Sequence, residues 1–288
     1  MLKLVGSGQF AGVLGWPLDE SLSPAIHNAA FRALHIDCAY FTWQVPPEQL
    51  ADAIGGIRAL RALGANVTVP HKEKIIEHLD QLSGDATEVG AVNTIQRVGE
   101  RLIGHNTDVD GFREFVAGDA GIDLAGKSVV VLGAGGAARA VVRAAGELGA
   151  SRVTVVARDP KRAERLTSLA EDVGVEAWDR AADAARDADA VVNATPLGSS
   201  DDDPLPDHEW RPGQVALDLL YLPPVTAFME RARVAGAESW GGLGMLVRQA
   251  AASFRIWTGQ DPPLGAMSAA AVHAIGASGS TRPPALPT

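Results

Sequence analysis

Hydrophobic and polar residues alternate along the first third of the chain with two different periods. Short runs with strand periodicity occur at residues 10–15, 39–45 and 66–69. Between and after them, residues 24–35, 47–64 and 72–81 repeat apolar positions at helical spacing. Residues 91–108 predict a hairpin with its turn at Gly99 and Glu100. Strands that alternate with helices predict an α/β fold.

The pattern changes from residue 127 onward. Residues 127–159 read as an apolar strand, a glycine-rich turn, a helix and a second apolar strand, which together form a βαβ unit. Residues 188–196 and 213–221 add strands of the buried type. Residues 244–259 and 266–276 predict two helices near the end of the chain. A second sheet, parallel and covered on both faces, is expected here.

Composition and charge narrow the class of protein. The chain has 288 residues, which favours two domains, and its 47% hydrophobic content is ordinary for a soluble globular protein. The net charge of -10 argues against nucleic acid and anionic membranes as partners. With Cys38 as the single cysteine and no signal-peptide pattern, a cytoplasmic location is expected. The tail at 277–288 is predicted to be disordered.

The glycine-rich turn predicts a dinucleotide site. Gly133, Gly135 and Ala138 match the pattern G-x-G-x-x-G/A directly after a strand and at the start of a helix. The first glycine permits the tight turn, the second lets the backbone approach a pyrophosphate, and the helix N-terminus attracts the anion. A purely structural turn in a parallel sheet is the alternative.

The end of the second strand favours NADP over NAD. An NAD site typically has an acid at this point, whereas this chain has Ala157, Arg158 and Asp159, followed by Arg162. The arginines can pair with a 2′-phosphate. Asp159 either repels that phosphate, caps the following helix or holds Arg162 in place.

Two further segments carry candidate chemistry. Pro70 predicts the end of the strand at 66–69, and Lys72 follows where a helix is expected to start. Ser23 before Pro24 predicts an N-cap and first helical residue, and Ser21 adds a second hydroxyl. A helix N-terminus with two serines can bind an anion, although plain capping by Ser23 explains the same pattern.

These segments occur in a recognisable order. GWPLDESLSPAIHN, NVTVPHKE, AVNTI, GHNTDVDG, GAGGAARA, NATPLG, DLLY and GMLVRQAAASF follow one another along the chain. The pattern closely resembles the shikimate dehydrogenase family over about residues 10 to 275, and NVTVPHK and NTDVDG are its most specific motifs. The resemblance implies reversible, NADPH-dependent reduction of 3-dehydroshikimate to shikimate, in chorismate and aromatic amino-acid biosynthesis, with no metal.

The resemblance also implies a domain plan. Residues 1–109 would form an α/β substrate domain that regains the helices at 245–276, and residues 110–244 would form a Rossmann-like NADP domain. A small-molecule substrate in the cleft and a monomer or homodimer are expected.

Site residues carry over by motif. Lys72 and Asp108 would be catalytic and would lie beside each other. The substrate would contact Ser21, Ser23, Asn66, Thr68, Lys72, Asn93, Asp108, Tyr221 and Gln249. The cofactor would contact Gly133, Ala134, Gly135, Gly136, Ala137, Ala157, Arg158, Asp159, Arg162, Leu219 and Gly242. An ammonium group suits this reaction because it stabilises the negative charge on a carbonyl oxygen and can donate a proton to it.

Several residues depart from the family pattern. Glu20 stands where the family often has His, Ala157 and Asp159 replace Asn and Thr, and Ser199 stands where Met is common. A quinate or amino-shikimate dehydrogenase of the same superfamily is therefore the nearest alternative. An NADP-binding sensor without activity is the alternative of another class.

Overall fold

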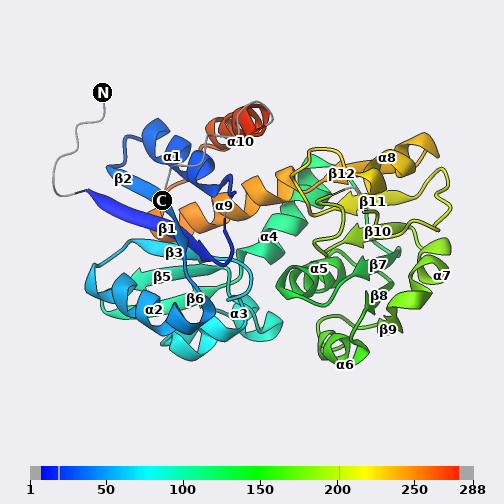
Figure 1. Cartoon of the computed structure of the whole chain (residues 1–288), viewed down its shortest axis with the longest axis horizontal. Helices are drawn as coiled ribbons and strands as arrows, with labels where there is room; N and C mark the ends of the chain where they lie inside the picture. Colours follow the sequence, from blue (N-terminus) through cyan, green and yellow to red (C-terminus); the bar gives the residue numbers. More distant parts are fainter. Residues whose placement is uncertain (1–7, 19, 201, 279–288) are drawn as a thin grey trace, which may run out of the picture.

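The protein consists of two α/β halves, each built on a six-stranded sheet (Figure 1). The structure, a computed structural model, describes residues 8–18, 20–200 and 202–278. The predicted two-domain α/β fold is confirmed. The disordered tail was predicted to begin at residue 277, but α10 continues to Ser278. The rest of the predicted tail, residues 279–288, lies outside the described residues.

The first sheet is mixed. Its order is β2 (Cys38–Gln44), β1 (Gln9–Gly15), β3 (Gly64–Val67), β5 (Thr94–Val98), β6 (Arg101–His105) and β4 (Gln81–Leu82). Strands β1, β2 and β3 are parallel, whereas β5 pairs antiparallel with both β3 and β6. The predicted hairpin is the β5–β6 pair, and Gly99 at its turn has a positive φ of 63° that favours glycine.

Helices cover both faces of the first sheet. On one face, α2 (Leu50–Ala59) and α3 (Gly84–Val89) contribute residues such as Ile54 and Ala86 to the core. On the other face lie α1 (Ser23–Ala33), α9 (Leu243–Thr258) and α10 (Leu264–Ser278). Phe254 and Met267 from the last two helices pack in one core with Ile26 of α1. The predicted return of the C-terminal helices to the first half is thus confirmed.

The second sheet is fully parallel. Its order is β12 (Glu238–Gly241), β11 (Val215–Asp218), β10 (Ala190–Asn193), β7 (Ser128–Leu132), β8 (Arg152–Ala157) and β9 (Val173–Ala177). Read along the chain, this is the doubly wound order in which the connections reverse direction between β7 and β10. Ligands of such sheets bind at the carboxyl ends of the strands beside this switch point.

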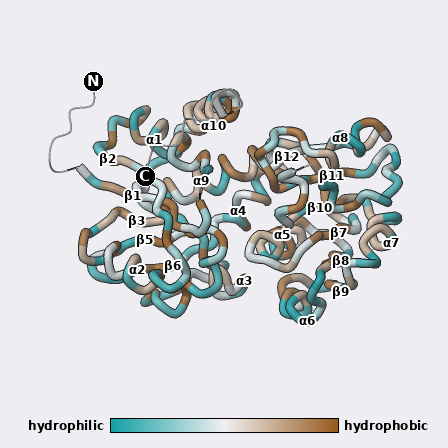
Figure 2. The backbone as a smooth tube through the Cα atoms, viewed as in Figure 1, coloured by the Kyte–Doolittle hydropathy of each residue, from teal (hydrophilic) through white to brown (hydrophobic). Residues whose placement is uncertain are grey.

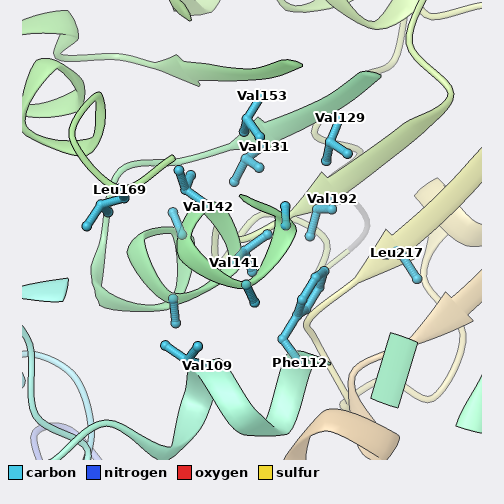
Figure 3. Packing of buried hydrophobic residues seen from close by; sticks show 14 of the residues in the cluster. Val109, Phe112, Val129, Val131, Val141, Val142, Val153, Leu169, Val192 and Leu217 are labelled. Atoms are coloured by element: carbon cyan, nitrogen blue, oxygen red, sulfur yellow. The ribbon is translucent and has the colours of Figure 1, made fainter. Parts of the chain in front are cut away.

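Helices also enclose the second sheet. The helices α4 (Thr107–Glu114), α5 (Gly136–Glu147) and α6 (Pro160–Ala163) pack on one face, and α7 (Ala181–Arg186) and α8 (Ala227–Val234) pack on the other. Figure 3 shows Val109 and Phe112 of α4 packed beside Val141 and Val142 of α5, below Val131. Burial of these branched side chains is the main stabilising contribution to this half.

Two helices join the halves. A π-helical turn at Phe115–Asp119 follows α4, and α9 packs closely along α4 where both cross between the sheets (Figure 1). The predicted domain boundaries at 109/110 and 244/245 fall inside these two helices and stay predictions. Figure 2 shows hydrophobic and hydrophilic residues interspersed along both halves, and no helix among the described residues is long and apolar enough to cross a membrane.

The segment after β3 differs from the prediction. Residues 72–81 form a 3₁₀ helix at Lys74–His78 rather than an α-helix, and Lys72 lies in the turn before it. The reason is the length of the connection. Leu79 is already extended, and Gln81 and Leu82 pair with β6, so the helix cannot continue to residue 81.

The start of α1 also differs. The helix begins at Ser23 itself, with Leu22 at the N-cap in a helical conformation and no side-chain cap. The predicted N-cap role of Ser23 is therefore wrong. The backbone N–H of Ser23 instead donates to Oγ of Ser21 at 3.3 Å.

Candidate active site

The glycine turn lies at the switch point of the parallel sheet. Gly133 directly follows β7 with φ 109°, a conformation that favours glycine, and its N–H donates to the carbonyl of Val156 at 2.8 Å. Gly135 is the N-cap of α5, and a side chain there would meet nothing within 4 Å. The first amides of α5 lack helical acceptors. The backbone of Gly133, Ala134, Gly135, Gly136 and Ala137 thus leaves space and N–H donors that fit a pyrophosphate.

The next strand end presents positive charge. Ala157 closes β8, and Arg158 and Arg162 are both exposed just beyond it. Asp159 is the N-cap of α6 and accepts the backbone N–H of Arg162 at 3.3 Å. Of the three roles considered for Asp159, the structure therefore has helix capping. The guanidinium of Arg162 pairs with Glu73 of the first half at 2.5 Å.

A cavity opens between the two halves and gathers residues that are far apart in sequence. All nine residues predicted to contact the substrate line it. These are Ser21, Ser23, Asn66, Thr68, Lys72, Asn93, Asp108, Tyr221 and Gln249. Three residues predicted to contact the cofactor, Ala137, Leu219 and Gly242, line the same cavity. A side chain at Gly242 would collide with the Leu219 carbonyl, so only glycine fits there.

The ion pair between Lys72 and Asp108 lies in the wall of this cavity. Nζ of Lys72 is 2.6 Å from Oδ2 of Asp108, and the two side chains are 16% and 7% exposed. Asn93 donates to the other carboxylate oxygen at 2.8 Å. Asp108 is in the first turn of α4, where its backbone N–H is capped by Asn106 at 3.1 Å. The helix N-terminus and two donors stabilise the charged carboxylate, which in turn orients the ammonium group.

A buried, uncharged hydrogen-bond network lies behind the ion pair. Asn66 donates from Nδ2 to the carbonyl of Asn93 at 3.1 Å and to Oγ of Ser253 at 3.0 Å. Its Oδ1 accepts the phenol of Tyr40 at 2.7 Å. Asn93 accepts the backbone N–H of Thr107 at 2.7 Å. Because carbonyls only accept and backbone N–H groups only donate, these contacts fix the orientation of both amides.

The opposite end of the cavity holds the two serines. Ser23 is 7% exposed, and Ser21 is half-buried two residues before the start of α1. Tyr221 enters from the loop after β11, and burial together with the charge of Glu20 raises the pKa of its phenol. The end is polar and lies at a helix N-terminus, as an anion site requires.

Sequence reasoning missed several residues of this region. Leu18, Val67, Met245 and Leu246 contribute apolar surface to the cavity, and Tyr40 and Ser253 lie in the network behind it. Met245 and Ser253 stand four residues before and after Gln249 on α9, so the helical repeat was a usable signal for both. Nothing in the local sequence marks Tyr40, which lies in the middle of β2.

Family models cover most of the chain in three segments. Residues 13–95 match the model described as shikimate dehydrogenase substrate binding domain. Residues 116–200 match the model of shikimate / quinate 5-dehydrogenase, and residues 242–272 match the shikimate 5'-dehydrogenase C-terminal domain.

Individual relatives agree with the family models. The chain is 43% identical over 282 residues to a shikimate dehydrogenase (NADP(+)) of Symbiobacterium thermophilum, covering 94% of this chain and 96% of the relative. It is 38% identical to a crystal structure of shikimate 5-dehydrogenase from Thermus thermophilus in complex with NADP(H) and shikimate, with a TM-score of 0.82 and coverage of 92% and 99%. Quinate dehydrogenase from Corynebacterium glutamicum in complex with NAD is 29% identical, with a TM-score of 0.82 and the same coverage.

A doubly wound sheet with a glycine turn, joined to a second α/β half across a polar cavity, defines a two-domain nucleotide-dependent oxidoreductase. The lysine–aspartate pair in the cavity wall is the arrangement that the predicted carbonyl chemistry needs. The chain belongs to the shikimate dehydrogenase family.

Proposed function

We propose that the protein is an NADP-dependent shikimate dehydrogenase that interconverts 3-dehydroshikimate and shikimate in the biosynthesis of chorismate and aromatic amino acids. The observation that carries the proposal is the Lys72–Asp108 ion pair of 2.6 Å, set in a cavity that also reaches Ala137 at the glycine turn. The relatives that share the sequence over nearly their whole length bear this activity in their names.

The two ends of the cavity position the substrate. Ser21 and Ser23 hold the ring carboxylate by their hydroxyls and by the N-terminal dipole of α1. At the other end, amide, hydroxyl and carboxylate groups face the ring hydroxyls. These groups belong to Asn66, Thr68, Asn93, Asp108 and Gln249, and the phenol of Tyr221 reaches the ring from the serine end. Because the amides are fixed from behind, they present the same polar atoms to each incoming substrate.

Lys72 acts on the carbonyl oxygen that becomes the hydroxyl. Its ammonium group is held by Asp108 and stabilises the negative charge that develops on this oxygen, and it then donates the proton. In the reverse direction the same amine accepts the hydroxyl proton. When bound, NADPH supplies the hydride, and the protein supplies position and the proton.

The second half holds the cofactor. The N-terminus of α5 would bind the pyrophosphate, and Arg158 and Arg162 would bind the 2′-phosphate. Leu219 and Gly242 line the substrate cavity from the second half, so they would lie beside the nicotinamide. The remaining predicted cofactor residues, Ala157 and Asp159, shape the strand end and cap α6.

Quinate oxidation is the second candidate function. It is favoured by the structural similarity to a quinate dehydrogenase. It is also favoured by Glu20, which precedes Ser21 and whose charge raises the pKa of the Tyr221 phenol. A carboxylate at this position changes the field that a substrate carboxylate meets.

Steady-state kinetics tests the proposal. Shikimate, quinate and amino-shikimate are each oxidised with NADP and with NAD, and the values of kcat/KM are compared. The proposal expects shikimate with NADP to give the largest value. A larger value for quinate with NAD would replace it by the quinate function. If no combination of substrate and cofactor were turned over, the protein would instead be interpreted as a non-catalytic NADP-binding sensor.

The cellular setting belongs to the same proposal. We expect a monomer or homodimer in the cytoplasm, a reducing compartment that suits a chain with a single cysteine. Light scattering after gel filtration measures the mass directly, and a larger assembly would contradict this part.

A further inference from the structure

The ion pair between Glu73 and Arg162 connects the two halves beside the active site. Glu73 directly follows Lys72, and Arg162 lies in α6, next to the end of β8. Their side-chain atoms Oε1 and Nη2 are 2.5 Å apart. The side chains are 36% and 52% exposed, so an incoming anion can reach both. The pair thus stands where the cofactor phosphate is expected.

Glu73 faces several arginines at this junction. Arg139 of α5 donates from Nε to the carbonyl of Val89 at 2.5 Å, which holds it against the first half. Burial lowers the pKa of Arg139, the charge of Glu73 opposes this, and the charges of Arg162 and Arg165 add to it. Figure 1 shows α3 and α5 adjacent at this junction. The guanidinium groups of Arg139 and Arg162 therefore both interact with the carboxylate of Glu73, and Arg165 lies close enough to Arg139 to act on it.

Asp159 does not take the place of Glu73. Although it lies only three residues before Arg162, its carboxylate accepts the backbone N–H of Arg162 and caps α6. The carboxylate that contacts the Arg162 guanidinium comes instead from the other half of the molecule, 89 positions away. An acidic residue of the substrate half thus forms an ion pair with a cationic group of the cofactor half.

We propose that Glu73 determines cofactor preference by competing with the 2′-phosphate of NADP for the Arg162 guanidinium. The inference rests on the proposed function, in which NADP is the cofactor. A bound 2′-phosphate has to displace the carboxylate or share the guanidinium with it, and a like charge beside it is unfavourable. NAD lacks this phosphate and leaves the ion pair intact. Glu73 therefore weakens the binding of NADP and leaves that of NAD unchanged.

The test is the binding of each cofactor to Glu73→Gln. Glutamine keeps the size of the side chain and removes its charge. Isothermal titration without substrate gives Kd for NADP and for NAD, so that the chemistry of the neighbouring Lys72 does not enter. Exposed ion pairs are weak, and we expect NADP to bind about two- to fivefold more tightly, with the Kd of NAD unchanged. An unchanged or weaker affinity for NADP would overturn the inference.

Two controls separate competition from a general charge effect. Glu77→Gln removes the same charge four residues further on, within the 3₁₀ helix that Glu73 precedes, and is expected to leave both Kd values unchanged. In an Arg162→Ala background, Glu73→Gln is expected to have no further effect on NADP. A gain that persists there, or that Glu77→Gln reproduces, would overturn the competition. A wild type that binds NAD as tightly as NADP would contradict the proposed cofactor itself, which is a separate outcome.

Discussion

The aliphatic part of Lys72 lies against Gly136 at the N-terminus of α5. A Cβ atom at position 136 would be 3.1 Å from Cδ of Lys72 and 3.5 Å from its Cβ. The ammonium end of the same side chain is fixed by Asp108 at 2.6 Å. The glycine turn thus has a second role besides leaving space for a pyrophosphate, since it also limits where the lysine can lie.

Gly136→Ala is expected to displace Lys72 and to lower kcat by about tenfold, because small misplacements of a reacting group reduce the rate strongly. In a Lys72→Ala background the clash is gone, so adding Gly136→Ala is expected to change kcat no further. The measurement is kcat for the four proteins, together with the Kd of NADP. If the loss in kcat of the double variant equals the product of the two single losses, Gly136 acts on the cofactor alone. The proposed coupling between Gly136 and Lys72 would then be wrong.

Replacing Lys72 by Ala is expected to lower kcat by roughly 10² to 10⁴, with a much smaller change in the KM of shikimate. The reason is that the ammonium group stabilises charge that exists only as the oxygen becomes negative. Lys74→Ala is the matched control, because it removes the same charge two residues away from an exposed position. Turnover of Lys72→Ala within about threefold of wild type would remove Lys72 from the reaction.

Ser21→Ala is expected to raise the KM of shikimate by roughly 10- to 150-fold, as befits the loss of a hydrogen bond to a charged group. The change also removes the acceptor of the Ser23 N–H, so stability is measured in parallel. Ser83→Ala is the control, because it removes a comparable acceptor from the N-cap of α3, which does not line the cavity. A KM equal to that of wild type would exclude Ser21 from the carboxylate site.

Arg158→Ala is expected to lower kcat/KM for NADP by about 10-fold or more, and to change kcat/KM for NAD little. Asp159→Thr is the companion variant, since threonine can still cap α6 and the change removes a negative charge. It is expected to leave the use of NADP equal or improved. An indifferent Arg158→Ala in an enzyme that uses both cofactors equally would point to the quinate type instead.

His27 is expected to make the protein sensitive to acid. It is completely buried behind Ser23, its ring stacks on Tyr40 with centroids 4.4 Å apart, and burial lowers its pKa from 6.5 to about 3. Between these two values the unfolded state binds a proton that the folded state does not. The free energy of unfolding therefore falls as the pH falls below 6.5, by about 2 kcal/mol at pH 5.

Urea unfolding at pH 7 and pH 5 measures this loss. His27→Phe keeps an aromatic ring on Tyr40 but cannot bind a proton, so its loss between the two pH values is expected to be smaller than that of wild type by about 2 kcal/mol. Equal losses in both proteins would show that other groups cause the acid sensitivity.

Local sequence patterns predicted the parts of the fold whose causes are local. The glycine turn, the βαβ unit and the hairpin at Gly99 depend on residues within a few positions, and all three are found in the structure. The helix at 72–81 was wrong because its length is set by the pairing of β4 with β6, which the segment itself does not encode. The cap at Ser23 was wrong because Leu22 is already helical.

The site shows the same division. The resemblance, and no local pattern, implied that Asp108 lies beside Lys72, because their contact joins positions 36 residues apart and follows from the packing of β3, β5 and α4. Tyr40 and Glu73 have their partners in other elements, so periodicity in their own segments carries no sign of either contact. Long-range pairs of this kind depend on the topology of the sheets, which a single sequence specifies only indirectly.

The return of α9 and α10 to the first half has a consequence for synthesis on the ribosome. The strands of the first sheet emerge early, yet α1 alone covers one face until Phe254 and Met267 have been made. The second sheet has all its strands and most of its covering helices between residues 107 and 241, so it can complete its core sooner. Domains that are contiguous usually fold in the order in which they are made. Here we expect the second half to complete its core before the first half does, so that the substrate cavity between them forms last.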